Sequence, residues 1–223
     1  DGRADFAVHS AKDLPSVTVP GLVLASVPER GDPRDALVGA TLADLPEGAE
    51  VATGSLRRQA ELRRHRPDLR FATLRGNMQT RLAKAADHDA IVVAATALDR
   101  LGLAEHIAER LEVDVMVPQV AQAALAVEAR ADDAELIARL ASVEHPPTRR
   151  CVDAERAFLA ELGGDCSLPA GAHAAIAPDG QVEVRGFLAA ADGTAHLRAS
   201  RVGASPTVGA ALAQALLADG GRA

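Results

Sequence analysis

The sequence predicts an α/β protein with more than one sheet. Three observations support this: strands alternate with helices three times in the middle of the chain, short strand patterns precede them, and an antiparallel pattern with two helices follows. The chain has 223 residues, of which 48% are hydrophobic and 25% charged. This composition can bury a core, and the length allows one large domain or about three small ones.

The first fifty residues are predicted to form two strands and a hinge. Residues 5–10 and 21–27 are short apolar runs typical of strands, and a loop is expected at 11–15. The run 28–35 is polar and rich in proline and glycine, so it is predicted to be a domain boundary. A short helix is expected at 41–45, where Pro46 would end it.

The middle of the chain repeats a strand followed by a helix. Such alternation indicates a parallel sheet covered by helices. The predicted strands are 50–53, 69–74 and 90–94, and the helices that follow them are 56–65, 78–86 and 97–101. One more helix is expected at 104–111.

The pattern changes beyond residue 120. The segment 122–130 fits either a strand or a helix, and 132–143 is an amphipathic helix with an aspartate at its start. A second boundary is expected at 144–147. The tail is predicted to be α+β, with helices at 148–162 and 206–217 and strands at 172–177, 181–189 and 195–202.

Basic charge is concentrated in one segment. The net charge of −7 argues against non-specific binding to nucleic acid. The segment 53–81 nevertheless holds eight arginines against two acidic residues, which indicates a specific anionic ligand. A solvated helix face is the favoured interpretation for Arg63, Arg64, Arg66 and Arg70.

Arginines also follow each strand of the repeats. An arginine in the first turn of a helix is unfavourable beside the positive end of the helix dipole, whereas free N–H groups and guanidinium groups together bind anions. In open α/β sheets this edge is where ligands bind. Ser55 and Asn77 are predicted N-caps. The predicted carboxylate- or phosphate-binding set is Arg57, Arg58, Arg75, Arg81 and Arg100.

Three further positions could carry chemistry. Lys12 and Asp13 follow the first strand, and a carboxylate beside a cation can stabilise developing positive charge or exchange a proton; a structural Asp-Leu-Pro turn is the alternative. Cys166 lies in a glycine-flanked loop, where a thiol can be reactive. Cys151 is predicted to lie in the core, and no metal site is evident.

Several motifs occur in a fixed order. The most specific are H-S-A-K-D-L-P at 9–15, S-L-R-R at 55–58 and R-G-N-M-Q-T-R at 75–81. The others are E-R-G-D-P-R-D-A at 29–36, L-D-R-L-G-L at 98–103, and A-E-R-A-F-L with G-G-D-C-S-L-P within 154–169. By these motifs the chain resembles the porphobilinogen deaminases along essentially its whole length.

The resemblance implies two domains like those of type II periplasmic binding proteins, with a ligand cleft between them, and a small C-terminal α+β domain. The expected division is 1–29 with 120–143, then 30–119, then 144–223, which carries the cofactor cysteine. The family's first strand, its early arginine and serine ligands and a mobile glycine-rich loop precede the motif at 5–15. The chain is therefore expected to lack much of the first domain.

The resemblance also implies a dipyrromethane cofactor joined by a thioether to Cys166. The implied enzyme is a transferase that adds four porphobilinogen units to this primer, releases ammonia each time and frees hydroxymethylbilane by hydrolysis, in tetrapyrrole (heme) biosynthesis. Asp13 matches the catalytic carboxylate. The positions that match cofactor- or substrate-binding residues are Lys12, Thr53, Ser55, Arg57, Arg58, Arg75, Arg81, Arg100 and Gln122. A cytoplasmic monomer without metal, nucleic-acid or membrane partners is expected.

The chain departs from the family at two more places. Ala121 and Ala123 stand where the family has glycines, so the local turn differs if those positions need backbone angles that alanine resists. Asp165 separates the glycines from Cys166 by one residue. The alternatives are an inactive fragment, a non-catalytic module that binds a small anion without a covalent adduct, and a nucleic-acid binder, for which the basic segment offers only Phe71 for stacking.

Overall fold

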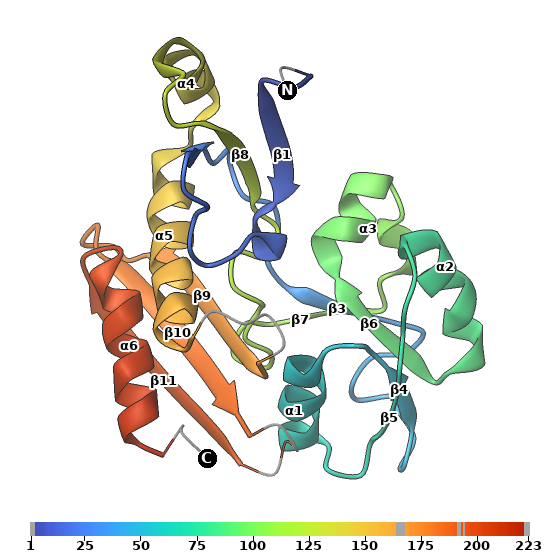
Figure 1. Ribbon diagram of the computed structural model, residues 1–223. Helices are drawn as coiled ribbons and strands as arrows, with labels where there is room; N and C mark the ends of the chain where they lie inside the picture. Colours follow the sequence, from blue (N-terminus) through green and yellow to red (C-terminus); the bar gives the residue numbers. More distant parts are fainter. Residues whose placement is uncertain (1–2, 164–167, 191–192, 194, 221–223) are drawn as a thin grey trace.

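The computed structural model describes residues 3–163, 168–190, 193 and 195–220, and the described strands form three sheets (Figure 1). The first sheet has the order β1-β8-β2, with β8 antiparallel to both neighbours. Its strands are β1 (Phe6–Ser10), β2 (Leu22–Ser26) and β8 (Leu125–Arg130). The sequence allowed either a strand or a helix for the segment 122–130. This segment is a strand from Leu125 onward, and it is the central strand of the first sheet.

The second sheet is the predicted parallel sheet with one antiparallel strand inserted. Its order is β5-β4-β6-β3-β7; β4 runs parallel to β5 and β6, whereas β3 is antiparallel to β6 and β7. The strands are β3 (Asp35–Val38), β4 (Glu50–Ala52), β5 (Arg70–Ala72), β6 (Ala90–Ala94) and β7 (Glu109–Leu111).

Helices cover both faces of this sheet. Leu62 of α1 packs into a core on one face with Leu37, and Leu98 of α3 packs into a core on the other face with Ile91. The alternating apolar strands and short helices thus bury two separate cores against one sheet. The helices are α1 (Leu56–His65), α2 (Met78–Ala83) and α3 (Ala95–Leu101), and η2 (Lys84–Asp87) continues α2 as a 3-10 turn.

Two predictions for this region were wrong, and one strand was not predicted. Residues 41–45 form a turn, in which the N–H groups of Asp44 and Leu45 donate to the Thr41 carbonyl, and not a helix. The segment 104–111 is a 3-10 turn, η3 (Ala104–His106), followed by strand β7. Only Asp35 of strand β3 falls within the predicted boundary 28–35, and no element was predicted for 36–38. The pairing of β3 with β6 and β7 decides the conformation of β3 and β7, and local propensity does not record that pairing.

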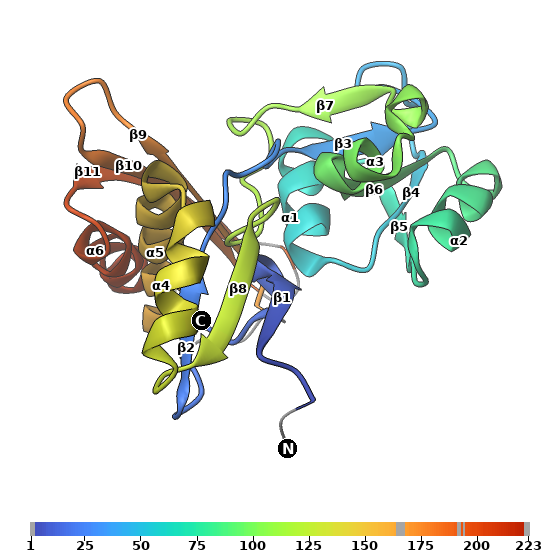
Figure 2. The same ribbon diagram turned by 90° about the horizontal axis from the view of Figure 1, so that it is seen from above.

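The third sheet forms the C-terminal α+β unit, as predicted. It is antiparallel with the order β11-β10-β9, and α5 and α6 pack against one another and against this sheet (Figures 1 and 2). Its elements are α5 (Pro146–Glu161), β9 (Ala170–Ile176), β10 (Val182–Ala189), β11 (His196–Gly203) and α6 (Thr207–Ala218). Cys151 is buried in its core, as expected.

Two connections, 27–34 and 112–124, join the first sheet to the second. The core of the C-terminal unit includes Val120, Ala121 and Ala124 of the second connection and Ala126 of β8, so the first sheet and the C-terminal unit share this core. The helix α4 (Ala134–Leu140) packs beside β2 and β8 and continues into η4 (Ala141–Val143) (Figure 2). None of the helices in the described part of the chain is long and apolar enough to cross a membrane.

Candidate functional site

The N-terminus of α1 lies at the carboxyl end of β4. Ser55 caps this helix, with its side-chain oxygen accepting a hydrogen bond from the Arg58 N–H at 3.4 Å, and buried Thr53 accepts one from the Ser55 N–H at 3.3 Å. Asn77 caps α2 in the same way, accepting from the Thr80 N–H at 2.9 Å. Both predicted N-caps are therefore confirmed, and they place the basic residues of both helices at one edge of the sheet.

Arg57 and Arg58 are buried and share one carboxylate. Asp35, at the start of β3, accepts from Arg57 Nη2 through Oδ2 at 2.7 Å and from Arg58 Nη2 and Nε through Oδ1 at 2.7 and 3.1 Å. The two guanidinium groups also donate to the main-chain oxygens of Val117 and Val92. These two predicted ligand residues are thus held rigidly by the protein itself.

The ionised form of Asp35 is strongly favoured. Burial by itself would raise the pKa of Asp35, but the guanidinium groups of Arg57 and Arg58 outweigh it and hold this pKa well below the ordinary value. Gln122 adds a hydrogen bond from Nε2 to Asp35 Oδ1 at 3.0 Å and another to the Pro33 oxygen at 2.7 Å. Gln122 therefore ties the second connection to the carboxylate.

Lys12 adds a third cation to this group. Burial, and next the positive charge of Arg58, lower the pKa of Lys12 to about 8. Arg81, on α2, also acts electrostatically on Arg58 and donates from Nε to the Gly76 oxygen at 2.8 Å. Lys12, Arg57, Arg58 and Arg81, with Asp35, are called the cationic cluster below; its cations outnumber its single carboxylate.

Asp13 is exposed beside this cluster. It ends a single 3-10 turn, η1 (Ala11–Asp13), directly after β1. The turn is fixed to the second connection because the Ala11 N–H donates to the Ala124 oxygen at 3.0 Å and Gln119 Nε2 donates to the Lys12 oxygen at 3.5 Å. An exposed carboxylate next to buried cations can hold N–H groups of a bound anionic molecule and exchange a proton with it.

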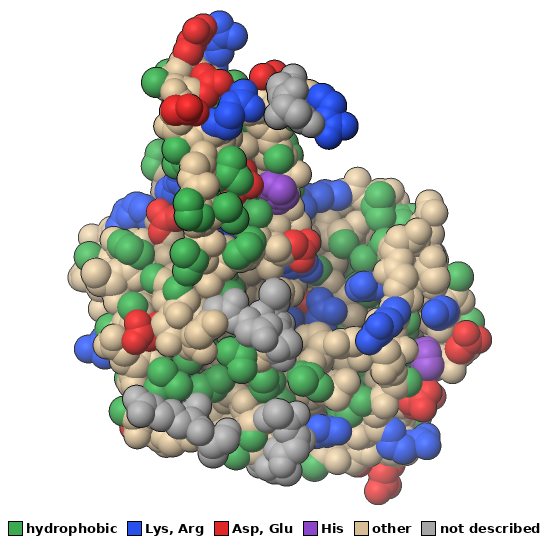
Figure 3. Space-filling view, viewed as in Figure 1, with side chains coloured by type: hydrophobic (Ala, Val, Ile, Leu, Met, Phe, Trp, Pro, Cys, Tyr) green, Lys and Arg blue, Asp and Glu red, His purple; other side chains and the backbone are tan. Residues whose placement is uncertain are grey.

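A cavity of about 280 Å³ opens at the N-terminus of α1. Its lining comes from the α1 start, from Gln119 of the second connection and from the beginning of the C-terminal sheet: Gly54, Ser55, Leu56, Arg57, Gln119, Leu168 and Ala170. Figure 3 shows Lys and Arg side chains around the hollow between the β1–β8 side of the molecule and the α2–α3 side. Cys166 and the departure at Asp165 lie outside the described residues.

The remaining predicted ligands lie farther from the cluster. Arg100, in the last turn of α3, donates from Nη2 to the Ala123 oxygen at 2.8 Å and so holds the residue next to Gln122. Arg75 is exposed on the loop before α2, and within the described residues no interaction joins its side chain to the cluster. Its role as a ligand stays a prediction.

The two alanines that flank Gln122 have left-handed backbone conformations. Ala121 has φ 57° and Ala123 has φ 70°, angles that glycine adopts freely and alanine does not. The chain therefore keeps at this place the backbone conformation that the family's glycines suit, at the expense of local strain.

The sequence analysis missed two carboxylates that organise the site, Asp35 and Glu61. Glu61 lies one turn after Arg57 on α1 and is fully buried; it accepts from the Val117 N–H at 2.9 Å, while Arg57 holds the oxygen of the same residue. Burial raises the pKa of Glu61, although Arg198 opposes this. The i, i+4 spacing of Arg57 and Glu61 was the available signal, since it places both on one helix face.

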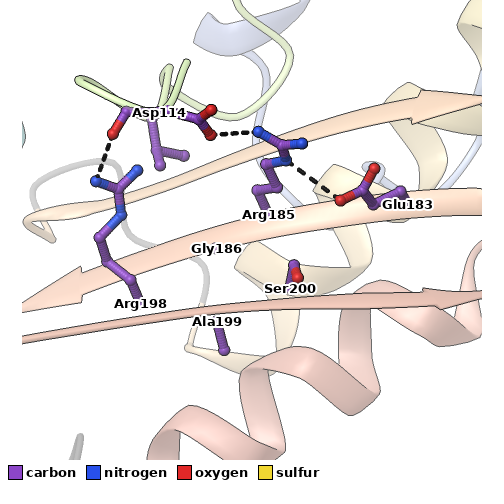
Figure 4. A pocket seen from close by; sticks show the side chains of 8 residues that line it. Asp114, Glu183, Arg185, Gly186, Arg198, Ala199 and Ser200 are labelled. Carbon is purple, nitrogen blue, oxygen red and sulfur yellow. Dashed lines mark hydrogen bonds and ion pairs between the residues drawn. The ribbon is translucent and has the colours of Figure 1, made fainter.

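A second hollow, of about 410 Å³, lies between the second connection and the C-terminal sheet. Arg185 of β10 and Arg198 of β11 point toward Asp114, and Arg185 also reaches Glu183 (Figure 4). Arg198 Nη1 donates to the Asp114 main-chain oxygen at 2.9 Å. Because both guanidinium groups have partners within the protein, this hollow is a junction between two parts of the chain.

Comparisons with known proteins match the whole chain. The family model described as "Porphobilinogen deaminase, dipyromethane cofactor binding domain" matches residues 1–138, and "Porphobilinogen deaminase, C-terminal domain" matches residues 149–218. A putative periplasmic sulfonate-binding protein from Methylobacillus flagellatus aligns with 70% of this chain and 48% of its own at 15% identity and a TM-score of 0.34, which supports no further argument.

Curated relatives agree with the family models. Proteins named porphobilinogen deaminase from Roseiflexus sp. (strain RS-1), Chromobacterium violaceum and Brevibacillus brevis are 52%, 48% and 42% identical to it. The alignments include 99–100% of this chain and 73–75% of those proteins. Both family models and these sequence identities show that the chain belongs to the porphobilinogen deaminase family.

Proposed function

We propose that this protein condenses porphobilinogen units stepwise on a covalent dipyrromethane primer, with loss of ammonia, and that hydrolysis then gives hydroxymethylbilane. The observation that carries the proposal is the cationic cluster. Pyrrole units with acetate and propionate side chains form a polyanion. The cluster has an excess of positive charge, and its buried member Arg57 lines the cavity. The activity of this chain as a transferase rests on its family membership together with this chemistry.

The chemistry of the donor set fits a carboxylate-rich cofactor. Asp35 neutralises one of the two guanidinium groups that it contacts, which leaves positive charge in a place from which water is largely excluded. Buried charge of one sign is unfavourable unless a partner completes it. Carboxylates of a bound pyrrole chain would complete it, and Arg57, Arg58 and Lys12 would hold them.

Cys166 is the residue proposed to carry the dipyrromethane by a thioether. Leu168 and Ala170, which follow it in sequence, line the cavity together with Ser55 and Arg57. When bound, the group supplies the primer to which new pyrrole units are joined. This chain's own residues bind the carboxylates and exclude water at the α1 N-terminus.

Asp13 is the proposed catalytic residue. Its carboxylate would accept hydrogen bonds from pyrrole N–H groups and stabilise the positive charge that develops as ammonia leaves. Its exposure at the end of η1, next to Lys12, keeps it available to a substrate, while the buried arginines stay fixed. Thr53, Ser55, Arg75, Arg81, Arg100 and Gln122 complete the proposed set of binding residues.

The division into three domains is part of the proposal. The strands of the first sheet lie within 6–26 and 125–130, those of the second within 35–111 and those of the third within 170–203. This supports domains at 1–29 with 120–143, at 30–119 and at 144–223. A monomeric, cytoplasmic enzyme with porphobilinogen as its small-molecule substrate is proposed on the same family basis.

The intact mass of the purified protein tests the function. We expect the wild-type chain to carry the added mass of one dipyrromethane and the Cys166→Ser variant to lack it, because serine forms no thioether. Cys151→Ser is the matched control: Cys151 is buried in the core, and burial raises the pKa of its thiol to about 11, so it is expected to keep the adduct.

The other outcomes contradict the proposal in distinct ways. An adduct that persists in Cys166→Ser would mean that another residue is the attachment site. A wild-type chain without any adduct, and without ammonia release from porphobilinogen, would overturn the enzymatic function and favour a non-catalytic module that binds small anions.

A further inference from the structure

The loop that carries Asp13 is fixed by different parts of the chain on its two sides. Before Asp13, the Ala11 N–H and the Lys12 oxygen are bonded to the second connection. After Asp13, Pro15 has no N–H group with which to anchor the backbone. The Leu14 N–H closes the turn on the Ala11 oxygen at 3.3 Å, and the contacts that tie this side of the turn to the rest of the protein are made at the oxygens of 15–16.

One arginine holds both of those oxygens. Arg156, on α5, donates from Nη2 to the Pro15 oxygen at 2.8 Å and to the Ser16 oxygen at 3.2 Å. The contact spans 141 and 140 residues of sequence and joins the helix of the C-terminal unit to the loop after β1. A guanidinium group can make both bonds because its N–H groups have a fixed planar geometry.

The pocket that Arg156 helps to line is too small for a ligand. This pocket, lined by Leu14, Pro15, Val17 and Glu128 among others, measures about 10 Å³. This is at the lower limit for one water molecule, and a pyrrole ring does not fit. Arg156 thus differs from the cationic cluster, which borders a cavity of about 280 Å³.

We propose that Arg156 is a positioning residue for the reaction: it fixes the oxygens of Pro15 and Ser16 and thereby sets where the Asp13 carboxylate lies. This rests on the proposed function, in which Asp13 acts on the substrate. Arg156 contacts neither substrate nor cofactor, so its influence passes through two residues of backbone. A displacement of about 1 Å at a reacting group can lower a rate roughly 100-fold.

The same helix provides a matched control. Arg149, seven residues earlier on α5, donates from Nη2 to the Leu24 oxygen at 2.6 Å and from Nε to Glu144 at 2.9 Å. It therefore also fastens α5 to a main-chain oxygen of the first sheet, but at β2 and away from Asp13. If weaker docking of α5 were the only effect of losing Arg156, variants of Arg149 and of Arg156 would lose activity alike.

The experiment compares Arg156→Met, Arg156→Lys and Arg149→Met with the wild-type protein carrying its cofactor. For Arg156→Met we expect kcat to fall roughly 10- to 100-fold while KM stays within about twofold, because binding groups are untouched. Arg156→Lys should recover part of kcat, since an ammonium group can reach one of the two oxygens. Arg149→Met should keep kcat within about twofold of wild type.

Hydrogen exchange of backbone amides gives a readout that is independent of turnover. We expect faster exchange at residues 11–17 in Arg156→Met, and at β2 but not at 11–17 in Arg149→Met. Unchanged exchange at 11–17, an equal loss of kcat in both methionine variants, or a raised KM with normal kcat would each overturn the proposal. If Arg156→Met does not fold, a normal kcat in the lysine variant with faster exchange would overturn it as well.

A wild-type protein that neither loads the cofactor nor turns over would refute the proposed function, and the positioning role with it. That outcome is distinct from failure of the Arg156 inference alone, which requires an active wild-type enzyme and unaffected variants.

Discussion

Asp35 accepts hydrogen bonds from Arg57, Arg58 and Gln122, which come from two different segments of the chain, helix α1 and the second connection. The carboxylate is fully buried, so its charge is compensated by protein groups alone. The motifs predicted that Arg57 and Arg58 bind an anion. They did not predict that these arginines also bind a carboxylate of the protein itself, that of Asp35. The partner lies 22 and 23 residues away along the chain and has no spacing signal.

Replacing Asp35 tests how strongly the protein depends on it. Asp35→Asn leaves two buried guanidinium groups without a negative partner, and loss of one member of a buried ion pair typically costs about 3–5 kcal/mol of unfolding free energy. Urea unfolding at neutral pH measures this. Asp68→Asn is the control, because the Asp68–Arg66 pair at 2.7 Å lies nearer the surface, and its loss should be clearly smaller.

The pH dependence of stability follows from the same carboxylate. Because the pKa of Asp35 is lower in the folded protein, its stabilising contribution is present above the unfolded-state pKa of about 3.9 and is lost as the pH falls through the folded value. The Asn variant should therefore lose less stability than wild type between neutral and acidic pH. Parallel pH curves for the two proteins would contradict this assignment.

Among the helices and strands, α1 agrees with its prediction at both ends. Leu56–His65 has Ser55 as N-cap, and its apolar residues face the sheet, so local chemistry and burial favour the same structure. The second connection is the opposite case. Ala121 and Ala123 adopt left-handed angles on either side of Gln122, which donates to the distant Asp35.

Glycine substitutions measure the strain in this connection. In the left-handed region an alanine costs roughly 1–2 kcal/mol. Relief of this strain should offset the lost methyl burial and the added chain entropy, so Ala121→Gly and Ala123→Gly should be nearly neutral in urea unfolding. Ala124 is equally buried without such an angle, and Ala124→Gly should lose about 1–2 kcal/mol. Equal losses in all three variants would show that the strain is absent.

The three sheets are joined at a buried ion pair. Glu155 of α5 accepts from Arg30 Nη1 at 2.6 Å, from the Ala121 N–H at 2.6 Å and from the Ala174 N–H at 2.7 Å. Arg30 in turn donates from Nε to the Gln122 oxygen at 2.7 Å. One carboxylate thus bonds to the first connection, the second connection and strand β9.

Glu155→Gln tests this joint. The variant leaves Arg30 buried without a negative partner, and we expect a loss of about 3–5 kcal/mol in unfolding free energy, with separate transitions for the C-terminal unit and the rest of the chain. Replacing both residues, as Arg30→Met with Glu155→Met, should recover part of the loss because no unpaired charge remains. Glu135→Gln is the control, because Glu135 forms an exposed pair with Arg139, and we expect it to change the free energy of unfolding by less than about 1 kcal/mol. A similar loss in both glutamine variants would contradict the role of Glu155 in joining the sheets.

Short-range patterns in the sequence were sufficient to predict the parallel βα units, the N-caps at Ser55 and Asn77 and the antiparallel C-terminal sheet. They were also sufficient to identify the family. Each of these depends on residues that are neighbours in the chain or on motifs of a few residues. Strand β3, strand β7 and the partners of the buried charges depended on contacts between distant segments. Arg30 and Glu155 are 125 residues apart, and Asp35 and Gln122 are 87 apart. Burial selects such partners because an unpaired charge is unfavourable only once folding has removed it from water.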